Sequence, residues 1–220
     1  AENIFDAATV MRQFSKQVVI QDKTHLVDTC GTGGDGIQTF NVSTLSAIVA
    51  ASAGVKVAKH GGRSVSSKCG SADVLEALGV NVNLTAEKVA SLVNEIGIAF
   101  MFAPNFHPAM RYAAPVRKKL GIRTIFNVLG PLANPALATR QVLGVYDMSL
   151  TQTMAEVLSK LGSEHVMVVH GEDGMDEISI ASPTTVTELK NKTITTYTIK
   201  PTDFGLDLAD LKAIQVENAD

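Results

Sequence analysis

Short apolar runs alternate with segments of helical periodicity along the chain, and this alternation constrains the fold more than any other feature of the sequence. The runs that predict strands cover residues 25–29, 55–60, 98–103, 141–146 and 165–170. The segments that predict helices cover residues 7–19, 44–53, 72–78, 86–96, 108–120 and 150–161. Such an order is typical of an α/β fold in which a mostly parallel central sheet is flanked by helices.

Two further patterns refine this prediction. Asp6 is expected to cap the first helix, whose apolar face we assign to Val10, Met11 and Phe14. The threonine-rich stretch 184–200 alternates with a period of two instead. It predicts an antiparallel hairpin near the edge of the sheet.

Composition excludes several classes of protein. The 220 residues are 45% hydrophobic and 19% charged, which suits one compact core or a domain and a half. Polar residues interrupt the longest apolar run, 45–57, so no membrane span is predicted, and no secretory signal opens the sequence. Cys30 and Cys69 form no CxxC motif, which fits a reducing cytoplasm. A net charge of −3 gives no general reason to bind nucleic acid or acidic membranes.

The stretch DTCGTGGDGIQTFNVST, residues 28–44 and here called the glycine loop, follows a predicted strand and leads into a helix. Gly31, Gly33 and Gly36 fit the letters GxGxxG. However, the acidic residue of a dinucleotide site is missing after the next strand, and so is the Gly-Lys-Ser/Thr of a Walker loop. Glycine backbone and the donors before a helix N-terminus can still hold an anion. Taken alone, the loop fits a phosphate site or a tight turn without a ligand.

The stretch KHGGRSVSSKCGS, residues 59–71 and here called the basic loop, follows the next predicted strand. It combines Lys59, His60, Arg63 and Lys68 with several serines and glycines. Because loops that follow parallel strands leave the same edge of a sheet, the two loops should face one crevice. We expect a ligand with more than one phosphate there, and a solvated basic turn is the alternative.

The stretch HGEDGMDEIS, residues 170–179 and here called the acidic loop, follows the fifth predicted strand. Its adjacent Asp176 and Glu177 carry oxygen ligands that suit Mg²⁺, which commonly bridges one or two carboxylates to substrate phosphates. Alone, the two residues would be read as solvated acids. Beside two phosphate-type loops, a metal site is the preferred interpretation.

Six stretches carry a resemblance to a known family. They are, in order, DTCGTGGDG, NVST, KHGGRSVSSKCGSADVLEALG, FAPNFHPAM, VRKKLGIRTIFNVLGPLANP and HGEDGMDEIS. Together they resemble the anthranilate phosphoribosyltransferases of tryptophan biosynthesis, nearly without a break from about residue 7 to 206. The resemblance implies a homodimeric glycosyltransferase of aromatic amino acid biosynthesis. It would use Mg²⁺ to transfer the 5-phosphoribosyl group from phosphoribosyl pyrophosphate to the amine of anthranilate.

The resemblance also implies the domain organisation. Residues 1–22 match part of an N-terminal helical domain and its linker, and residues 23–220 match the α/β phosphoribosyltransferase domain. Because the family's chains are longer at both ends, we expect both domains to be incomplete in this sequence. The segment 104–120 is expected to pack with the helical part.

Site residues of the family correspond to several groups in this sequence. The phosphoribosyl pyrophosphate site matches Gly31, Gly34, Asp35, Thr39, Asn41, Val42, Ser43, Thr44, Lys59, His60, Gly61, Gly62, Arg63, Ser64, Val65, Ser66, Ser67 and Ser71. The anthranilate site matches Gly31, Gly62, His107 and Arg117. Ser43, Asp176 and Glu177 match the metal ligands, and we expect two Mg²⁺ ions with the donor. His60 and Arg117 match the residues expected to be catalytic.

One residue departs from the family pattern. Where the family commonly has an asparagine that contacts anthranilate, this chain has Gly62. Either that contact is missing here, or glycine is needed for a positive φ. Arg117 is expected to hold the carboxylate of anthranilate, and a cation that completes the helix dipole is the alternative.

Two other functions remain open from the sequence. Pyrimidine nucleoside phosphorylases have a similar fold and also transfer ribosyl groups, but an Asp-Glu pair suits a magnesium-dependent pyrophosphate donor better than free phosphate. A non-enzymatic nucleic-acid-binding relative would need a basic surface rich in aromatic residues. This chain has 19 Lys plus Arg against 22 Asp plus Glu, and 5% aromatic residues.

Overall fold

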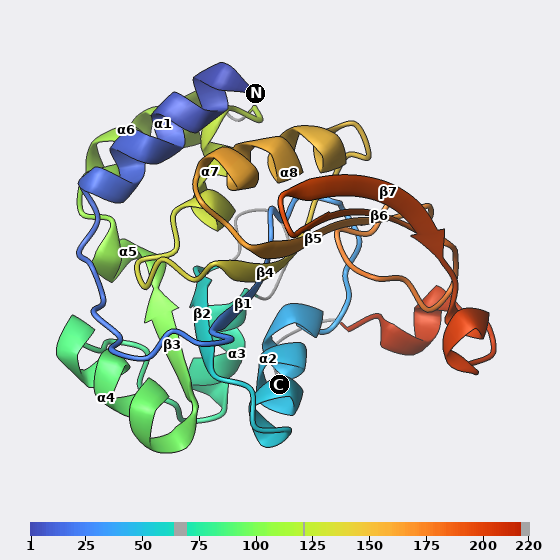
Figure 1. Cartoon of the computed structure of the whole chain (residues 1–220), viewed down its shortest axis with the longest axis horizontal. Coiled ribbons are helices and arrows are strands. Elements are labelled where there is room, and N and C mark those ends of the chain that lie inside the picture. The colour runs from blue at the N-terminus through green and yellow to red at the C-terminus, as the bar shows by residue number, and fades with distance from the viewer. Residues whose placement is uncertain (64–69, 121, 217–220) are drawn as a thin grey trace.

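The structure, a computed structural model, describes residues 1–63, 70–120 and 122–216. Its centre is a seven-stranded sheet in the order β3-β2-β1-β4-β5-β6-β7 (Figure 1). The strands are β1 (Val27–Gly31), β2 (Val57–Gly61), β3 (Ile98–Phe102), β4 (Arg140–Gly144), β5 (His165–Gly171), β6 (Thr184–Lys190) and β7 (Thr193–Ile199). Strands β1 to β5 are parallel, and β6 and β7 are antiparallel. The predicted α/β fold is confirmed, and so is the predicted hairpin.

Helices connect the strands, with short 3-10 helices near the end of the chain. They are α1 (Glu2–Gln13), α2 (Val42–Ser52), α3 (Ser71–Ala77), α4 (Ala86–Ile96), α5 (Ala103–Phe106), α6 (Met110–Leu120), α7 (Phe126–Leu132), α8 (Leu150–Lys160), η1 (Pro201–Phe204) and η2 (Leu211–Ile214). The two short helices α5 and α7 were not predicted, because each contains a proline and spans no more than seven residues. Within the described residues, no helix is long and apolar enough to cross a membrane.

The sheet has a hydrophobic core on each face. Helices α1, α7 and α8 cover one face, and α2, α3 and α4 cover the other (Figure 1). On the first face, Leu143, Met154 and Leu158 are buried in one cluster. On the second face, Val89 and Met101 belong to another. The strands are therefore buried on both sides, as expected for a parallel sheet.

The predicted bounds of the first helix were wrong, and its predicted apolar face was correct only at Met11, which packs against the core. The helix begins at Glu2 and ends at Gln13, so Asp6 lies inside it and does not cap it. Ala8 is fully buried, whereas Val10 and Phe14 are 52% and 65% exposed. Packing against α7 and α8 selects the face that contains Ala8, because that face fills the core.

Pairing along the sheet differs between the two sides of β1. With β4, strand β1 pairs continuously from Val27↔Arg140 to Gly31↔Gly144. With β2, the described residues of β1 pair only at Val27↔Val57. The carboxyl ends of the parallel strands lie at one edge of the sheet, where the glycine, basic and acidic loops begin.

Candidate active site

The glycine loop leaves β1 through a series of left-handed turns. Gly33, Gly34 and Gly36 have φ values of 63°, 82° and 80°, a region that side chains with a Cβ rarely adopt. Between them, Asp35 accepts a hydrogen bond at Oδ1 from the backbone N–H of Ile37 at 3.1 Å. The loop is therefore tight for a local backbone reason, and its glycines leave little side-chain bulk above the sheet edge.

The end of this loop forms the N-terminus of α2. Asn41 Oδ1 accepts hydrogen bonds from the backbone N–H of Thr44 at 3.0 Å and from Ser43 Oγ at 3.4 Å. Ser71 Oγ, at the start of α3, donates to the same Asn41 oxygen at 3.3 Å. The predicted meeting of the glycine loop and the basic loop is thus present in the described residues. The backbone N–H groups and the positive end of the α2 dipole favour an anion at this point.

Lys59, the first residue of the stretch called the basic loop, belongs to β2 and contacts the end of the glycine loop. Its side chain is on β2, is 2% exposed, and donates from Nζ to the carbonyl of Thr29 at 2.5 Å and to Ser43 Oγ at 3.0 Å. Burial lowers the pKa of the lysine, while the charges of Asp28 and Glu177 oppose that effect. A cation is therefore held under the N-terminus of α2, where it adds to the attraction for an anion.

The acidic loop brings carboxylates to the same place. Asp176 Oδ2 accepts a hydrogen bond from the backbone N–H of Gly33 at 2.7 Å. Burial, and then the charge of Asp35, raise the pKa of Asp176. Burial, and then the charge of Asp176, raise the pKa of Glu177 to about 8. Carboxylates whose charged forms are disfavoured in this way fit a site that a cation would complete.

A complete metal cage is not present among the described residues, where no three His, Cys, Asp or Glu side chains group closely enough to enclose an ion. A cation bound to Asp176 and Glu177 would therefore take further ligands from a substrate or from water. That arrangement suits Mg²⁺, which keeps several waters and binds substrate phosphates.

Two glycines make room for the acidic loop on the sheet. Gly31 and Gly144 lie opposite each other in β1 and β4. A Cβ on Gly31 would lie 2.5 Å from Asp176 Oδ2, and a Cβ on Gly144 would overlap the carbonyl oxygen of Asp176. The backbone of the acidic loop can therefore rest directly on the sheet because both positions lack a side chain.

His60 and His107 form a buried pair. Their Nε2 atoms are 3.2 Å apart, and the rings meet edge to face. Burial, and then the neighbouring His107, lower the pKa of His60 to about 3. Burial lowers the pKa of His107 to about 4. Both imidazoles are therefore neutral at pH 7, and one of the two Nε2 atoms can donate to the other.

Other predicted site residues lie differently. The guanidinium of Arg63 is bound to Asp73 and Glu76 of α3, so it does not point at the glycine loop. Arg117 lies 5.5 Å from the centre of the Phe126 ring, and no hydrogen bond in the described part of the chain joins it to the loops. Ser64, Val65, Ser66 and Ser67 lie outside the described residues.

The remaining predictions concern the backbone of the basic loop. Gly62 does not have a positive φ, and a Cβ added to it would meet open space. The alternative that Gly62 is required for a left-handed backbone is therefore wrong. Gly61 is different, because a Cβ there would lie 3.0 Å from the Phe100 ring. Thr39 forms a β-bridge with Gln215, which ties the glycine loop to the end of the described chain.

Some residues near the site had no predicted role. Asp28 and Asn134 are buried and joined by a hydrogen bond of 2.8 Å. Arg123 donates to the carbonyl of Gly34 in the glycine loop. Gly144 leaves room for the backbone of the acidic loop to pack on the sheet. The sequence offered signals for two of these residues, because Asp28 is a charged residue directly after an apolar pair and Gly144 lies inside a predicted strand.

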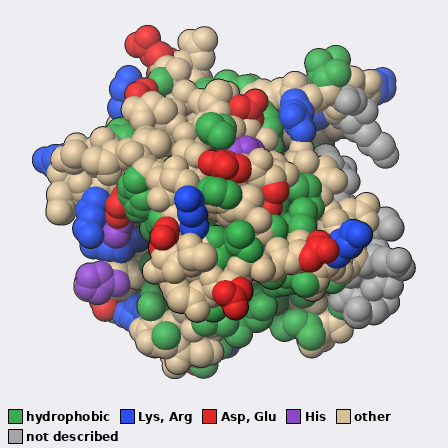
Figure 2. Space-filling model, turned by 90° about the vertical axis from the view of Figure 1, so that its right-hand side faces the viewer, with side chains coloured by type: hydrophobic (Ala, Val, Ile, Leu, Met, Phe, Trp, Pro, Cys, Tyr) green, Lys and Arg blue, Asp and Glu red, His purple; other side chains and the backbone are tan. Residues whose placement is uncertain are grey.

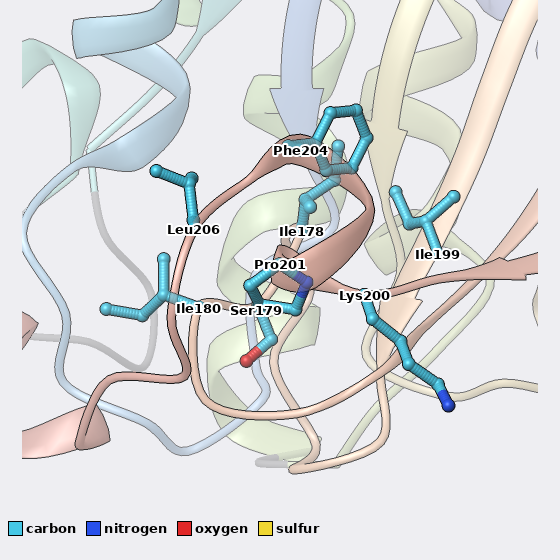
Figure 3. Close-up of a pocket in the computed structure, with 8 residues that line it drawn as sticks. All are labelled: Ile178, Ser179, Ile180, Ile199, Lys200, Pro201, Phe204 and Leu206. Atoms are coloured by element: carbon cyan, nitrogen blue, oxygen red, sulfur yellow. The ribbon is translucent and has the colours of Figure 1, made fainter.

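A small cavity of about 90 Å³ lies next to the acidic loop but has a different character (Figure 3). It is lined by Ile178, Ser179, Ile180, Ile199, Lys200, Pro201, Phe204 and Leu206. The lining is mostly apolar, and Lys200 extends its amino group away from the other side chains (Figure 3). This mostly apolar lining does not suit a phosphate group.

The fold and the three loops agree with the comparisons to known proteins. Residues 23–220 match the family described as glycosyl transferase family, a/b domain, and the chain belongs to this family. It is 57% identical over 214 residues to the anthranilate phosphoribosyltransferase of Nitrosomonas europaea, covering 97% of this chain and 63% of that protein. The resemblance inferred from the sequence motifs is thus confirmed.

Solved structures of similar proteins have the same fold. Anthranilate phosphoribosyltransferase from Thermus thermophilus superposes with a TM-score of 0.90 at 45% identity, covering 98% of this chain and 64% of that one. The enzyme from Saccharomyces cerevisiae, solved in complex with PRPP and Mg, gives a TM-score of 0.90 at 35% identity, covering 99% and 60%. The yeast enzyme has also been solved with 4-fluoroanthranilate. The present chain spans a little under two thirds of the length of these relatives.

Proposed function

We propose that the protein transfers the 5-phosphoribosyl group from phosphoribosyl pyrophosphate to the amine of anthranilate, giving N-(5-phosphoribosyl)anthranilate and pyrophosphate. One observation carries the proposal: the glycine, basic and acidic loops converge at one sheet edge. Lys59 Nζ lies 3.0 Å from Ser43 Oγ, and Asp176 Oδ2 lies 2.7 Å from the Gly33 nitrogen. The yeast relative solved with PRPP and Mg, 35% identical to this chain, supports the same donor.

The donor side of the reaction calls for groups that stabilise a leaving anion. The bond between the ribose C1 and the pyrophosphate oxygen breaks, and its electron pair leaves with pyrophosphate. The N-terminus of α2 and the buried Lys59 would hold that anion, since both place positive charge where negative charge develops. Two Mg²⁺ ions, held by Ser43, Asp176 and Glu177, would neutralise the same charge when bound.

The acceptor side calls for orientation more than for a strong base. The amine nitrogen of anthranilate forms the new bond to C1 and then loses a proton. Neutral His60 and His107 could orient the uncharged amine, and Arg117 could hold the carboxylate of anthranilate. Arg117 would have to turn from the Phe126 ring to do so. The yeast relative solved with 4-fluoroanthranilate supports an acceptor of this type.

The proposal extends to the assembly of the protein. We infer that residues 1–22 and the segment 104–120 belong with a helical domain, that residues 23–220 are the α/β domain, and that the protein is a homodimer. A role in tryptophan biosynthesis in the cytoplasm is part of the same proposal. It is supported by the resemblance of the motifs and by the relatives' names.

The alternative functions are less well supported. On the face shown in Figure 2, the acidic and basic side chains of the described residues are scattered among hydrophobic ones and form no continuous basic stripe of the kind that a nucleic acid would need. A nucleoside phosphorylase would use free phosphate, for which Asp176 and Glu177 provide no rationale.

The experiment that tests the proposal is an assay of N-(5-phosphoribosyl)anthranilate formation by the full-length protein at graded Mg²⁺ concentrations. The double variant Asp176→Asn with Glu177→Gln should raise the Mg²⁺ concentration for half-maximal turnover by about tenfold or more, since amides are weaker ligands for a hard cation. The amide that replaces the Asp176 carboxylate would keep an oxygen acceptor for the Gly33 N–H, so the loop should stay in place.

A matched control comes from the same loop. Glu172→Gln removes an exposed negative charge from the acidic loop and should leave the Mg²⁺ dependence unchanged. Turnover without Mg²⁺, or ribosyl transfer to free phosphate in place of anthranilate, would contradict the proposed function.

A further inference from the structure

The ladder between β1 and β2 stops after one residue pair. In a parallel ladder that starts at Val27↔Val57, the next bonds would join Thr29 to Ala58 and to His60. The N–H of Thr29 would donate to the carbonyl of Ala58, and the N–H of His60 would donate to the carbonyl of Thr29. Together these two bonds would pair Thr29 with Lys59, but that pair does not form, although both strands lie within the described residues and continue to Gly31 and Gly61.

Three side chains bind three of the four backbone groups that these two ladder bonds would have joined. Asp28 Oδ1 accepts from the N–H of His60 at 3.0 Å. Asn134 Nδ2 donates to the carbonyl of Ala58 at 2.9 Å. Lys59 Nζ donates to the carbonyl of Thr29 at 2.5 Å. The gap between the strands is therefore filled by hydrogen-bonding side chains, and these backbone groups remain satisfied.

Asp28 and Asn134 also fix each other. Asn134 Nδ2 donates to Asp28 Oδ2 at 2.8 Å, and Asn134 Oδ1 accepts from the N–H of Ala136 at 2.8 Å. The amide has one orientation that satisfies all three bonds, so its position is well determined. Asp28 is fully buried and Asn134 is 3% exposed.

This arrangement has a cost in stability that a continuous ladder would not have. Burial raises the pKa of Asp28, which shows that its charged form is disfavoured there. Replacing buried charged groups by well-packed apolar ones is often neutral or stabilising. A buried carboxylate that interrupts a sheet therefore suggests a role other than stability.

The separated strands lead to the two halves of the site. Strand β1 leads into the glycine loop, which would hold the donor, and β2 carries His60 and ends at Gly61, where the basic loop continues beside the acceptor. From these contacts we propose that Asp28 and Asn134 are positioning residues: they hold the carboxyl ends of β1 and β2 apart and so set the distance between donor and acceptor. This inference rests on the proposed function.

The test compares variants of the full-length protein in steady-state turnover and in separate calorimetric titrations of phosphoribosyl pyrophosphate and anthranilate. Asp28→Ala should lower kcat by about 100-fold, the loss expected when reacting atoms are misplaced by about 1 Å. The affinity for each ligand alone should change much less, because each loop keeps its own contacts. Asp28→Asn keeps an oxygen for the His60 N–H, and its kcat should fall less, by about tenfold.

A control separates positioning from general destabilisation. Val166→Ala removes buried volume from β5, away from the β1/β2 gap, and should lower the melting temperature without lowering kcat per folded molecule. The proposal is overturned if Asp28→Ala loses no more kcat than Val166→Ala, or if its loss comes entirely from weaker ligand binding. Equal losses in Asp28→Ala and Asp28→Asn would also overturn it, since the effect would then depend on charge and not on spacing.

A crystal structure of Asp28→Ala gives a readout that does not depend on turnover. The N–H of His60 should move toward the carbonyl of Thr29 as the ladder extends, and an unchanged gap would overturn the spacing role. If the wild-type protein makes no product from these substrates, the proposed function fails, and this structure still decides whether Asp28 separates the strands.

Discussion

Strand β1 is bordered by two seams of opposite character. The β1/β4 seam is paired along all five residues of β1, whereas the described residues of the β1/β2 seam are paired at Val27↔Val57 alone. The β1/β4 border, here called the closed seam, ends in Gly31 and Gly144, and the acidic loop packs directly on these two glycines. The β1/β2 border, here called the open seam, is filled by the side chains of Asp28, Lys59 and Asn134.

The difference shows how a parallel sheet can serve two purposes at one edge. Backbone hydrogen bonds fix the distance between β1 and β4. The acidic loop, which packs on the end of these strands, therefore has a defined position. Side chains set the open seam, so its width depends on their size and hydrogen bonds. Under the proposed function, the closed seam would place the metal ligands, and the open seam would place the two substrates relative to each other.

The largest effect is expected from breaking the closed seam with Gly144→Ala. The added Cβ would overlap the carbonyl oxygen of Asp176, so the acidic loop must move off the sheet. We expect kcat/KM to fall by more than about 100-fold and the free energy of unfolding to fall by about 1–3 kcal/mol. Mg²⁺ titration of turnover and chemical denaturation would measure the two effects.

Gly62→Ala is the matched control for that variant. It makes the same chemical change at the same sheet edge, but its Cβ enters open space beside the open seam. The Mg²⁺ concentration for half-maximal turnover should stay at the wild-type value. If Gly144→Ala also keeps the wild-type Mg²⁺ concentration for half-maximal turnover, the position of the acidic loop does not depend on a glycine at this site.

Much of the fold could be predicted because it follows from local patterns. The alternation of apolar runs and helical segments identified the strands β1 to β5, and the threonine-rich stretch identified the hairpin β6-β7. The turn between these two strands places Asn191 and Lys192 at positive φ, as a type I′ hairpin turn requires. The face of α1 was predicted correctly only at Met11, because packing against other helices selected it.

The site was predictable only in part, for a related reason. Glycine-rich and charged loops after successive strands pointed to one edge, and the contacts of Ser43 with Lys59 and of Asn41 with Ser71 agree with that prediction. The pairing of Arg63 with α3 could not be read from its loop. The Asp28–Asn134 contact joins residues 106 positions apart, and no local pattern predicts such a contact.

The next largest effect is expected from removing Lys59 from the open seam. Lys59→Met keeps most of the side-chain volume but leaves the Thr29 carbonyl and Ser43 without their donor. Phosphoribosyl pyrophosphate binding should weaken by about 1.5–3 kcal/mol, the usual range for a hydrogen bond to a charged group. Separate calorimetric titrations would measure it, with anthranilate as the comparison ligand. Equal losses for both ligands would mean that Lys59 supports the fold and not the donor site.

A moderate effect is expected when low pH protonates His60 and His107, the buried histidine pair beside the open seam. The pKa values of His60 and His107 are lowered to about 3 and about 4, below the ordinary value of 6.5. The unfolded chain therefore binds more protons than the folded chain between pH 6.5 and 4, so stability falls as the pH is lowered through that range. Each histidine contributes up to about 1.4 kcal/mol per pH unit.

The variant His107→Gln should reduce the slope of the free energy of unfolding against pH. The reduction should be the contribution of one histidine, up to about 1.4 kcal/mol per pH unit. Denaturation curves collected from pH 7 to pH 4 would measure the slope. His25→Asn serves as the control, because His25 is exposed and asparagine tolerates its positive φ of 56°. A slope that is the same in His107→Gln as in His25→Asn would show that the buried pair is not what acid destabilises.

The smallest effect is expected at Gly62, where the open seam has unused room. Because Gly62 has no positive φ and a Cβ there meets nothing within 4 Å, Gly62→Asn should be free of both backbone strain and steric conflict. If the asparagine that the family commonly has there contacts anthranilate, the variant should regain one ordinary hydrogen bond of about 1 kcal/mol. The KM for anthranilate would then fall by about fivefold, while the KM for phosphoribosyl pyrophosphate stays nearly constant. Gly62→Ala again provides the comparison, since it adds a side chain without an amide. An equal change of KM in both variants would assign the effect to the filled space, and a loss of donor binding would place Gly62 in the donor half of the site.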